Sequence, residues 1–488
     1  MNAARPLRDI LPDGVTLDDT LLDLPVAGLA LDSRSVQPGF VFAALPGVKA
    51  HGRQFIPMAE DKGAAAILGT PDTATRKPLI AVEDPREALA QMASKFYPGQ
   101  PDTVAAVTGT NGKSSTVEFL RQIWSRAGFE AAALGTLGVT LASGRTEFGY
   151  TTPDAIRLHQ AISELRVKGV THLAMEASSH GLKQRRMDGV TVSLAGFTNL
   201  TQDHLDYHSD FEDYFASKMR LFDTLLPKGG SAVVDVDTQW GARVAARAEE
   251  LGLEVFTVGW AGRDLQLKEI TPHPASQDIE LVYQGEAHSI TLPLIGEFQA
   301  ANALMATGLA IRSGVAPGAA LESLKHLTGV PGRLEQAGKT RQGSPVLIDY
   351  AHTPDGLEKL LRAARPHTQG RIVLVFGAGG DRDPTKRAKM GEVARKLADL
   401  SIVTDDNPRS EDPAKIRKAI LEACPGAREI GDRGEAIYTA VSLLDAGDTL
   451  LIAGKGHETG QTVGDEVIAF DDGETARQAL ARREGAHE

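Results

Sequence analysis

The segment Thr108-Gly109-Thr110-Asn111-Gly112-Lys113-Ser114-Ser115 joins a predicted strand, residues 103–108, to a predicted helix. Apolar residues at helical spacing indicate that helix: Val117, Leu120, Ile123, Trp124 and Ala127. Glycines allow the backbone to turn its N–H groups inward, and the helix N-terminus adds positive potential for a phosphate. Lys113 supplies a charge for the β- and γ-phosphates, and Ser114 a hydroxyl for Mg²⁺.

Val107 stands where the longer form of this loop has its first glycine, so the loop is a shortened variant. The alternative is a tight turn with a surface lysine. The combination of strand, loop, Gly-Lys-Ser-Ser and helix favours nucleotide phosphate binding, and the predicted binding residues are Gly109, Thr110, Asn111, Gly112, Lys113, Ser114 and Ser115.

Alternation of apolar stretches and helical patterns predicts an α/β protein of three domains. The first, residues 1–97, is a smaller α/β domain with strands at 39–44, 64–68 and 79–82 and a helix at 85–96. The second, residues 98–330, contains the phosphate loop and a central P-loop-type parallel sheet with helices, including strands at 170–177 and 190–198. The third, residues 331–488, is a doubly wound Rossmann-like domain with strands at 346–350, 371–376, 400–404 and 449–453.

Bulk properties limit the classes of partner. The 488 residues carry a formal net charge of -12, which argues against a nucleic acid or an acidic membrane surface as partner. The single cysteine, Cys424, excludes an internal disulfide and a cysteine-based zinc site. Acidic residues interrupt the N-terminal segment and no apolar run reaches about 18 residues, so we expect no signal peptide, no membrane insertion and a cytoplasmic location.

Two further residues of the second domain are typical of a phosphate-transfer centre. Glu176 ends an apolar strand, where a carboxylate is well placed to hold Mg²⁺ near the phosphate loop. Lys218 shares the apolar face of a helix with Phe211, Tyr214 and Phe215. Burial favours its neutral amine, which can react with carbon dioxide to give an anionic carbamate. By periodicity alone, a lysine that extends to water is the favoured interpretation.

The phosphate loop resembles that of the Mur ligases and of the folylpolyglutamate synthetases, which join an amine to a carboxylate through an acyl phosphate. The stretch Asn199-Leu200-Thr201-Gln202-Asp203-His204-Leu205-Asp206-Tyr207-His208, followed by Ser217-Lys218, is similar to the Mur ligase family in particular. This resemblance implies ATP as co-substrate and Mg²⁺ as cofactor. The implied catalytic residues are Lys113, Glu176, His204 and Lys218. The implied metal site comprises Ser114, Glu176, Lys218 as its carbamate, and His204.

The resemblance also assigns substrate contacts. For the nucleotide it implies Asn302 and Arg333. For a UDP-linked muramoyl peptide it implies residues of the first two domains: Leu31, Ser33, Val48, Lys49, Ala50, Thr151, Thr152, Ser178, Gln184 and Arg186.

The motif Asp406-Asn407-Pro408-Arg409 resembles the one that selects diaminopimelate within the family. Diaminopimelate differs from lysine by a distal carboxylate, which an arginine can bind through two charge-assisted hydrogen bonds. Arg382, Gly454 and Glu458 complete the predicted amino-acid site, with Glu458 accepting from an ammonium group. The implied activity is an ATP-dependent, ADP-producing ligation of meso-diaminopimelate to UDP-N-acetylmuramoyl-L-alanyl-D-glutamate by a monomer.

Four alternatives stay open. An L-lysine-adding ligase would run the same reaction, and a folylpolyglutamate synthetase-like ligase would leave the first domain unexplained. A non-catalytic nucleotide-binding scaffold conflicts with the set Lys113, Glu176 and Lys218. A dinucleotide-dependent oxidoreductase is disfavoured because Arg382 occupies the last glycine position of the required motif.

Overall fold

The computed structural model describes residues 4–47, 51–146, 152–201 and 207–485. The chain divides into two compact units, the first comprising residues 1–266 and 304–320 and the second residues 267–303 and 321–488.

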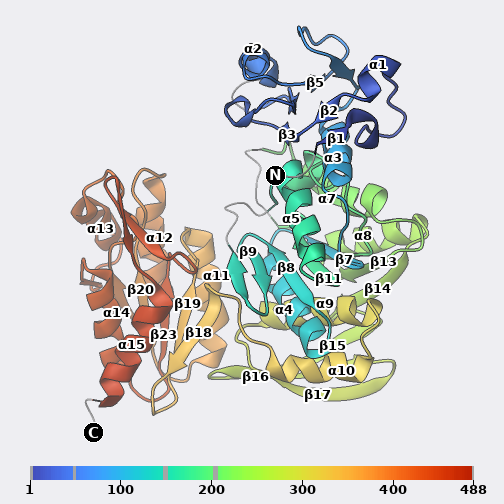
Figure 1. Cartoon of the computed structure of the whole chain (residues 1–488). Helices are drawn as coiled ribbons and strands as arrows, with labels where there is room; N and C mark the ends of the chain where they lie inside the picture. Colours follow the sequence, from blue (N-terminus) through green and yellow to red (C-terminus); the bar gives the residue numbers. More distant parts are fainter. Residues whose placement is uncertain (1–3, 48–50, 147–151, 202–206, 486–488) are drawn as a thin grey trace. The chain divides into compact units, whose positions relative to one another are not determined.

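The N-terminal part of the first unit is built on a parallel sheet (Figure 1) in the order β3-β4-β5-β6, with β3 at Gly28–Ala30, β4 at Phe40–Ala43, β5 at Ala66–Gly69 and β6 at Leu79–Ala81. Helix α3, Pro85–Phe96, begins at an Asp84 side chain that accepts from the backbone N–H groups of Arg86 and Glu87. The predicted strands and helix are present; strand β3 and the short elements β1 (Arg5–Pro6), β2 (Pro25–Val26), α1 (Asp19–Leu22) and α2 (Ile56–Asp61) were not predicted.

The rest of the first unit is built on eight strands of an 11-stranded sheet, in the order β10-β9-β8-β11-β7-β12-β13-β14. Strands β8, β11, β7, β12, β13 and β14 run parallel, while β9 and β10 extend one edge antiparallel. Their bounds are β7 Thr103–Thr108, β8 Ala131–Gly135, β9 Gly138–Leu141, β10 Gly144–Thr146, β11 His172–Glu176, β12 Leu194–Phe197, β13 Ser231–Asp235 and β14 Glu254–Gly259. The helices are α4 Lys113–Arg126, α5 Ala155–Val167, α6 Ser179–Lys183, α7 Phe211–Arg220 and α8 Gln239–Glu250, and α10 Pro317–Ser323 begins in this unit and ends in the second.

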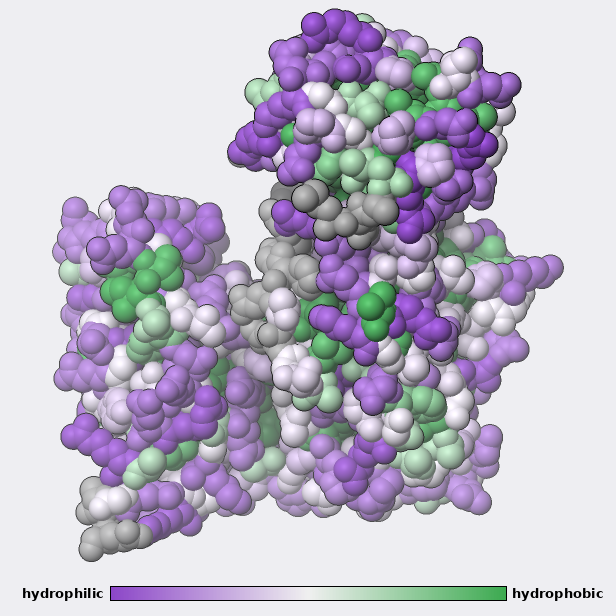
Figure 2. Space-filling model, in the orientation of Figure 1, coloured by the Kyte–Doolittle hydropathy of each residue, from purple (hydrophilic) through white to green (hydrophobic). Residues whose placement is uncertain are grey.

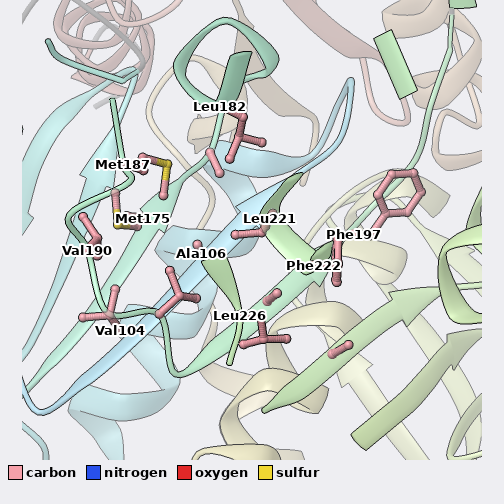
Figure 3. Packing of buried hydrophobic residues seen from close by; sticks show 14 of the residues in the cluster. Val104, Ala106, Met175, Leu182, Met187, Val190, Phe197, Leu221, Phe222 and Leu226 are labelled. Carbon is pink, nitrogen blue, oxygen red and sulfur yellow. The ribbon is translucent and has the colours of Figure 1, made fainter. Parts of the chain in front are cut away.

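One face of this sheet carries a large apolar core. Val104 and Ala106 of β7 point into it, and Met175 of β11 and Phe197 of β12 join them. Figure 3 shows the packing around these strands of Leu182, Met187 and Val190, which follow β11, and of Leu221, Phe222 and Leu226, which follow α7. Helix α4 packs on β7, β8 and β11. Strand β7 therefore lies inside the sheet, and the loop that follows it is anchored by buried structure.

The second unit contains strands β15 Leu265–His273, which begins in the first unit, β16 Ser276–Tyr283 and β17 Glu286–Leu292. Helix α9, Glu297–Arg312, leads out of this unit. The C-terminal sheet has the order β18-β19-β23-β20-β21-β22, with only β18 antiparallel. Its strands are β18 Arg333–Lys339, β19 Pro345–Asp349, β20 Ile372–Phe376, β21 Leu400–Val403, β22 Arg428–Glu429 and β23 Thr449–Ala453, and a hairpin of β24 Gly460–Val463 and β25 Glu466–Ala469 follows.

Strand alternation divides this C-terminal core into two layers. Leu374 and Phe376 of β20 pack with helices α11 (Pro354–Ala364), α12 (Thr385–Leu397) and α13 (Pro413–Leu421). Val373 and Val375 pack with helices α14 (Arg433–Ser442) and α15 (Asp472–Gly485). Helices therefore cover both faces of the sheet, as the doubly wound prediction requires.

Hydrophilic residues dominate the face drawn in Figure 2, and apolar residues gather there only in small patches. Among the described residues, no helix combines the length and the apolar character that a bilayer span requires.

Replacing the fully buried Val104 by Ala removes two methyl groups from the core of the first unit. We expect the free energy of unfolding of this unit to fall by about 2 kcal/mol. Urea denaturation followed by tryptophan fluorescence measures it, because Trp124, Trp240 and Trp260 all belong to that unit. The matched control, Val167→Ala, truncates a side chain on a residue that is 85% exposed and should change the free energy by less than about 0.5 kcal/mol. Equal losses in the two variants would contradict the assigned core.

Candidate functional site

The phosphate loop leaves the carboxyl end of β7 and enters α4. Gly109 and Gly112 have φ angles of 149° and 85°, which favour glycine. A Cβ atom at Gly109 would also overlap the hydroxyl of Thr198, at the end of the neighbouring strand β12. The carbonyl of Asn199 accepts from Thr110 N at 2.8 Å, and its side-chain oxygen accepts from Asn111 N at 3.0 Å. The loop conformation is therefore fixed by the segment that follows β12.

Two lysines converge on this loop. Lys113 Nζ donates to the carbonyls of Gly109 at 2.9 Å and Thr110 at 2.8 Å, and Lys218 Nζ donates to the same Gly109 carbonyl at 2.8 Å. Lys218 is only 1% exposed and lies 4.3 Å from the centre of the Tyr214 ring. The apolar-face position predicted for Lys218 is thus a buried position beside the phosphate loop, and not one from which the side chain extends to water.

Glu176 ends β11, the parallel neighbour of β7. It is 1% exposed, and its Oε1 accepts from the Ser114 hydroxyl at 2.9 Å and from Thr136 N at 2.8 Å. The structure therefore brings together two oxygen groups predicted for Mg²⁺, and hard oxygen ligands fit that ion. His204, the fourth predicted metal residue, lies outside the described residues.

The predicted muramoyl-peptide contacts form one connected cluster beside Glu176. Thr152 Oγ1 lies 3.2 Å from the Glu176 carbonyl and 3.0 Å from Ser178 Oγ. Arg186 donates to the Thr152 carbonyl at 2.5 Å and, through Nη2, to Gln184 Oε1 at 2.8 Å. Ser178 also caps helix α6 by accepting from Gly181 N. Thr151, the remaining predicted contact here, is outside the described residues.

Five of the predicted contacts to the UDP-linked muramoyl peptide belong to the N-terminal domain. Leu31 and Ser33 follow strand β3, which pairs in parallel with β4. Ser33 is 5% exposed, and its hydroxyl donates to Met58 Sδ at 3.2 Å. Val48, Lys49 and Ala50 are outside the described residues, so the structure places two of these five predicted contacts.

In the second unit, Asn302 and Arg333 meet through Gln299. Asn302 Nδ2 donates to Gln299 Oε1 at 3.4 Å, and Gln299 Nε2 donates to the Arg333 carbonyl at 3.1 Å. The Arg333 guanidinium lies 5.3 Å from the centre of the Tyr350 ring. Burial raises the pKa of the neighbouring Asp349 carboxyl, while Arg333 and two backbone N–H groups oppose that rise.

The predicted amino-acid site is built from loops at the carboxyl ends of β20, β21 and β23, which are adjacent in the sheet. Gly380 N donates to the Asn407 carbonyl at 2.9 Å, and Arg409 Nη1 donates to the Gly380 carbonyl at 2.8 Å. Asn407 Nδ2 donates to Glu458 Oε2 at 2.9 Å. These bonds join the loops that carry Arg382, Asp406, Asn407, Pro408, Arg409, Gly454 and Glu458.

Backbone strain and burial mark the same loops. Arg409 has a φ angle of 53°, which is unfavourable for a residue with a side chain and is typical of functional loops. Asp406 is 7% exposed, and its Oδ2 has no hydrogen-bond partner among the described residues. Arg382 is exposed at the surface of its loop. Arg382 and Arg409 offer positive charge for a distal carboxylate, and Asp406 offers negative charge for an ammonium group.

The structure adds supporting residues that the sequence did not single out as site residues: Thr136, Asn199, Gln299 and Lys386. The sequence pattern around these residues gives little indication of a site, because each acts through a contact with a residue distant in sequence. Lys386 Nζ, for example, donates to the carbonyl of His352 at 3.1 Å, and burial lowers the pKa of its ammonium group.

Family models match three segments of the chain. Residues 25–97 match the Mur ligase family catalytic domain, residues 107–310 the Mur ligase middle domain, and residues 332–456 the Mur ligase glutamate ligase domain. The chain is 52% identical over 464 residues to the UDP-N-acetylmuramoyl-L-alanyl-D-glutamate--2,6-diaminopimelate ligase of Agrobacterium fabrum, and the match covers 95% of each chain.

Solved structures are similar over almost the whole chain. A UDP-N-acetylmuramoyl-L-alanyl-D-glutamate--2,6-diaminopimelate ligase has a TM-score of 0.75 at 30% identity, covering 99% of this chain and 100% of that one. A MurF ligase from Thermotoga maritima in complex with ADP has a TM-score of 0.60 at 19% identity, covering 97% and 100%. These matches confirm the predicted three-domain α/β fold, while the boundaries and site residues drawn from the sequence stay predictions.

A Gly135→Ala variant tests the site around Glu176. The added Cβ would overlap Glu176 Oε1, and because this carboxylate is buried it can move only by leaving Ser114. We expect the affinity for a non-hydrolysable ATP analogue with Mg²⁺ to fall about tenfold, as for loss of one charge-assisted hydrogen bond. Isothermal titration calorimetry measures this affinity. Gly318→Ala on α10 is the control, since its Cβ would meet no atom within 4 Å. Unchanged affinity in Gly135→Ala would contradict the assignment of Glu176 and Ser114 to the site that binds ATP with Mg²⁺.

Proposed function

Because this chain belongs to the Mur ligase family, we propose that it joins meso-diaminopimelate to UDP-N-acetylmuramoyl-L-alanyl-D-glutamate at the expense of ATP, in the synthesis of a peptidoglycan precursor. The observation that carries this proposal is the 52% identity, over 95% of both chains, to a ligase named for these two substrates. The products are the amide, ADP and phosphate.

The first step is transfer of the γ-phosphoryl group of ATP to the γ-carboxylate of the glutamyl residue. A carboxylate oxygen forms the new bond to phosphorus and ADP leaves. Lys113 and the backbone N–H groups of the loop bind the phosphates and stabilise the charge that develops on the transferring group. The cluster of Thr152, Ser178, Gln184 and Arg186 positions the muramoyl peptide beside the loop, next to Glu176.

In the second step the neutral amine of diaminopimelate attacks the acyl phosphate carbon. The amide bond forms, phosphate leaves, and the amine releases its proton. Arg409 and Arg382 bind the distal carboxylate and Glu458 an ammonium group, which holds the attacking amine in position. Asn302 and Arg333 bind the nucleotide.

Ser114 and Glu176, with Lys218 as its carbamate and His204, would hold Mg²⁺. When bound, the ion neutralises charge on the phosphates. The buried position of Lys218 supports the carbamate, because burial favours the neutral amine. A neutral amine combines with carbon dioxide with loss of one proton. The added carboxylate would supply a metal ligand beside Gly109. We propose a cytoplasmic setting, where ATP is available, and a monomeric form, which light scattering tests.

A coupled assay of ADP release tests the function. We expect ADP release only when UDP-N-acetylmuramoyl-L-alanyl-D-glutamate and meso-diaminopimelate are both present. Faster turnover with L-lysine would establish the lysine-adding alternative, and activity on a folate in place of the UDP substrate would establish the folylpolyglutamate alternative. ATP binding without turnover would leave a scaffold.

Arg409→Ala tests the selection of the amino acid. Loss of two charge-assisted hydrogen bonds to the distal carboxylate should raise KM for diaminopimelate about 100-fold and change KM for ATP little. L-lysine, which lacks that carboxylate, should be used as poorly as before. Arg395→Ala, at an exposed position of α12, serves as the control. Normal diaminopimelate kinetics in Arg409→Ala would refute the assigned role.

Lys218→Arg tests the carbamate. Arginine keeps a positive charge but cannot take up carbon dioxide in this way, so kcat should fall at least about 100-fold, the scale of losing a preorganised charge-stabilising group. With ¹³C-bicarbonate, the wild-type protein should show a carbamate carbon signal in NMR that the variant lacks. Lys228→Arg, at an exposed position, should retain both signal and activity. A variant with normal kcat would exclude the carbamate from the mechanism.

A further inference from the structure

Lys455 is a fully buried lysine between two of the predicted amino-acid-binding motifs. Its exposed fraction is 0%, and it follows strand β23 by two residues. A buried ammonium group is strongly unfavourable unless acceptors surround it. The groups that accept its hydrogen bonds therefore indicate what it organises.

Three acceptors from different segments surround Lys455 Nζ. Asn407 Oδ1 lies at 3.2 Å, Glu458 Oε2 at 3.3 Å and the carbonyl of Gly460 at 2.5 Å. Asn407 belongs to the loop after β21, Glu458 to the loop after β23, and Gly460 begins the β24–β25 hairpin. One cation thus connects the segments that would surround the amino acid.

The contacts form a closed network. Asn407 Nδ2 donates to the same Glu458 Oε2, at 2.9 Å, and Asn407 Oδ1 also accepts from Thr462 N at 2.9 Å. Glu458 Oε2 therefore has two donors, the Lys455 ammonium and the Asn407 amide, which together fix the orientation of the carboxylate. Glu458 itself is only partly buried, so it can reach a ligand while its supports lie inside the protein.

We propose that Lys455 is a positioning residue for the amino-acid substrate, acting through Glu458 and Asn407. This inference rests on the proposed function. The ammonium group of the substrate and Lys455 share the Glu458 carboxylate, so that Lys455 holds it in the orientation in which it accepts from the substrate. Without Lys455, Glu458 loses its charged support and Asn407 loses a neighbour that fixes its side-chain amide.

A purely structural lysine would behave differently from a positioning one. Removing one partner of a buried ion pair is strongly destabilising when the other charge stays buried without compensation. The Glu458 side chain is 33% exposed, so water can solvate its carboxylate once Lys455 is replaced. Lys455→Met should therefore leave a folded protein in which the substrate-facing carboxylate is poorly oriented. The effect of a positioning residue is confined to one substrate and depends on Glu458, whereas general destabilisation affects all substrates and does not depend on Glu458.

The test uses the full-length enzyme and the coupled ADP assay, with KM and kcat for each of the three substrates. In Lys455→Met we expect KM for meso-diaminopimelate to rise about 10- to 100-fold, as for loss of a hydrogen bond to a charged group. KM for ATP and for the UDP substrate should change less than about twofold, and kcat at saturation should fall less than KM rises. Lys455→Gln, which stays polar, carries the same test if the methionine variant does not fold. Lys415→Met, at an exposed position of α13, is the matched control.

A double-mutant cycle with Glu458→Gln separates the two interpretations. If Lys455 acts through Glu458, adding Lys455→Met to Glu458→Gln should raise KM for diaminopimelate by no more than about threefold further. Full additivity, or a rise shared by all three substrates, overturns the proposal. An unchanged diaminopimelate KM in both Lys455 variants of an active enzyme also overturns it. Absence of diaminopimelate-dependent ADP release from the wild-type protein would instead refute the proposed function.

Discussion

The close approach of the phosphate loop to the end of β12 places two lysines on one backbone oxygen, the carbonyl of Gly109. Lys113, from the loop itself, and Lys218, from α7, both donate to this one oxygen. The arrangement requires a backbone that passes close to Thr198, which a side chain at Gly109 would prevent. Because α7 is held by the core shown in Figure 3, the lysine that approaches the loop from outside is placed by apolar packing. The loop conformation, and with it the contacts of Lys113 and Lys218 to Gly109, depends on this close approach.

In each unit, adjacent parallel strands bring loops that are distant in sequence together at one edge of a sheet. In the first unit, β7 and β11 are parallel neighbours, so the phosphate loop and Glu176 emerge side by side. In the second unit, β23, β20 and β21 are adjacent, so the three loops predicted to bind the amino acid are connected by hydrogen bonds. Parallel sheets collect the ends of distant segments at one edge, where buried strands can support polar loops. Glu176 and Lys455 show how such sites retain buried charge: each is surrounded by groups from several segments.

The elements predicted most accurately from the sequence are those whose formation depends on residues close together in the chain. Helix α3 and strands β7 and β23 have the predicted bounds, since capping, alternation and apolar spacing act within a few residues. Contacts between residues that are distant in sequence were predicted less well. Periodicity alone favoured a solvent-reaching Lys218, and only the packing of α7 against the sheet buries it. Asn199 and Thr136 were likewise not chosen as site residues, because their partners Asn111 and Glu176 lie far along the chain.

The fold class, the phosphate loop and the family resemblance can be predicted from residue types at short spacings. Tertiary structure decided which of the named residues meet: Ser114 with Glu176, Lys218 with Gly109, and Asn407 with Glu458. It also revealed that Lys455 lies between two binding motifs rather than at the surface. The physical reason is that burial and hydrogen bonding are set by neighbours in space, and in a parallel α/β sheet those neighbours are distant in sequence.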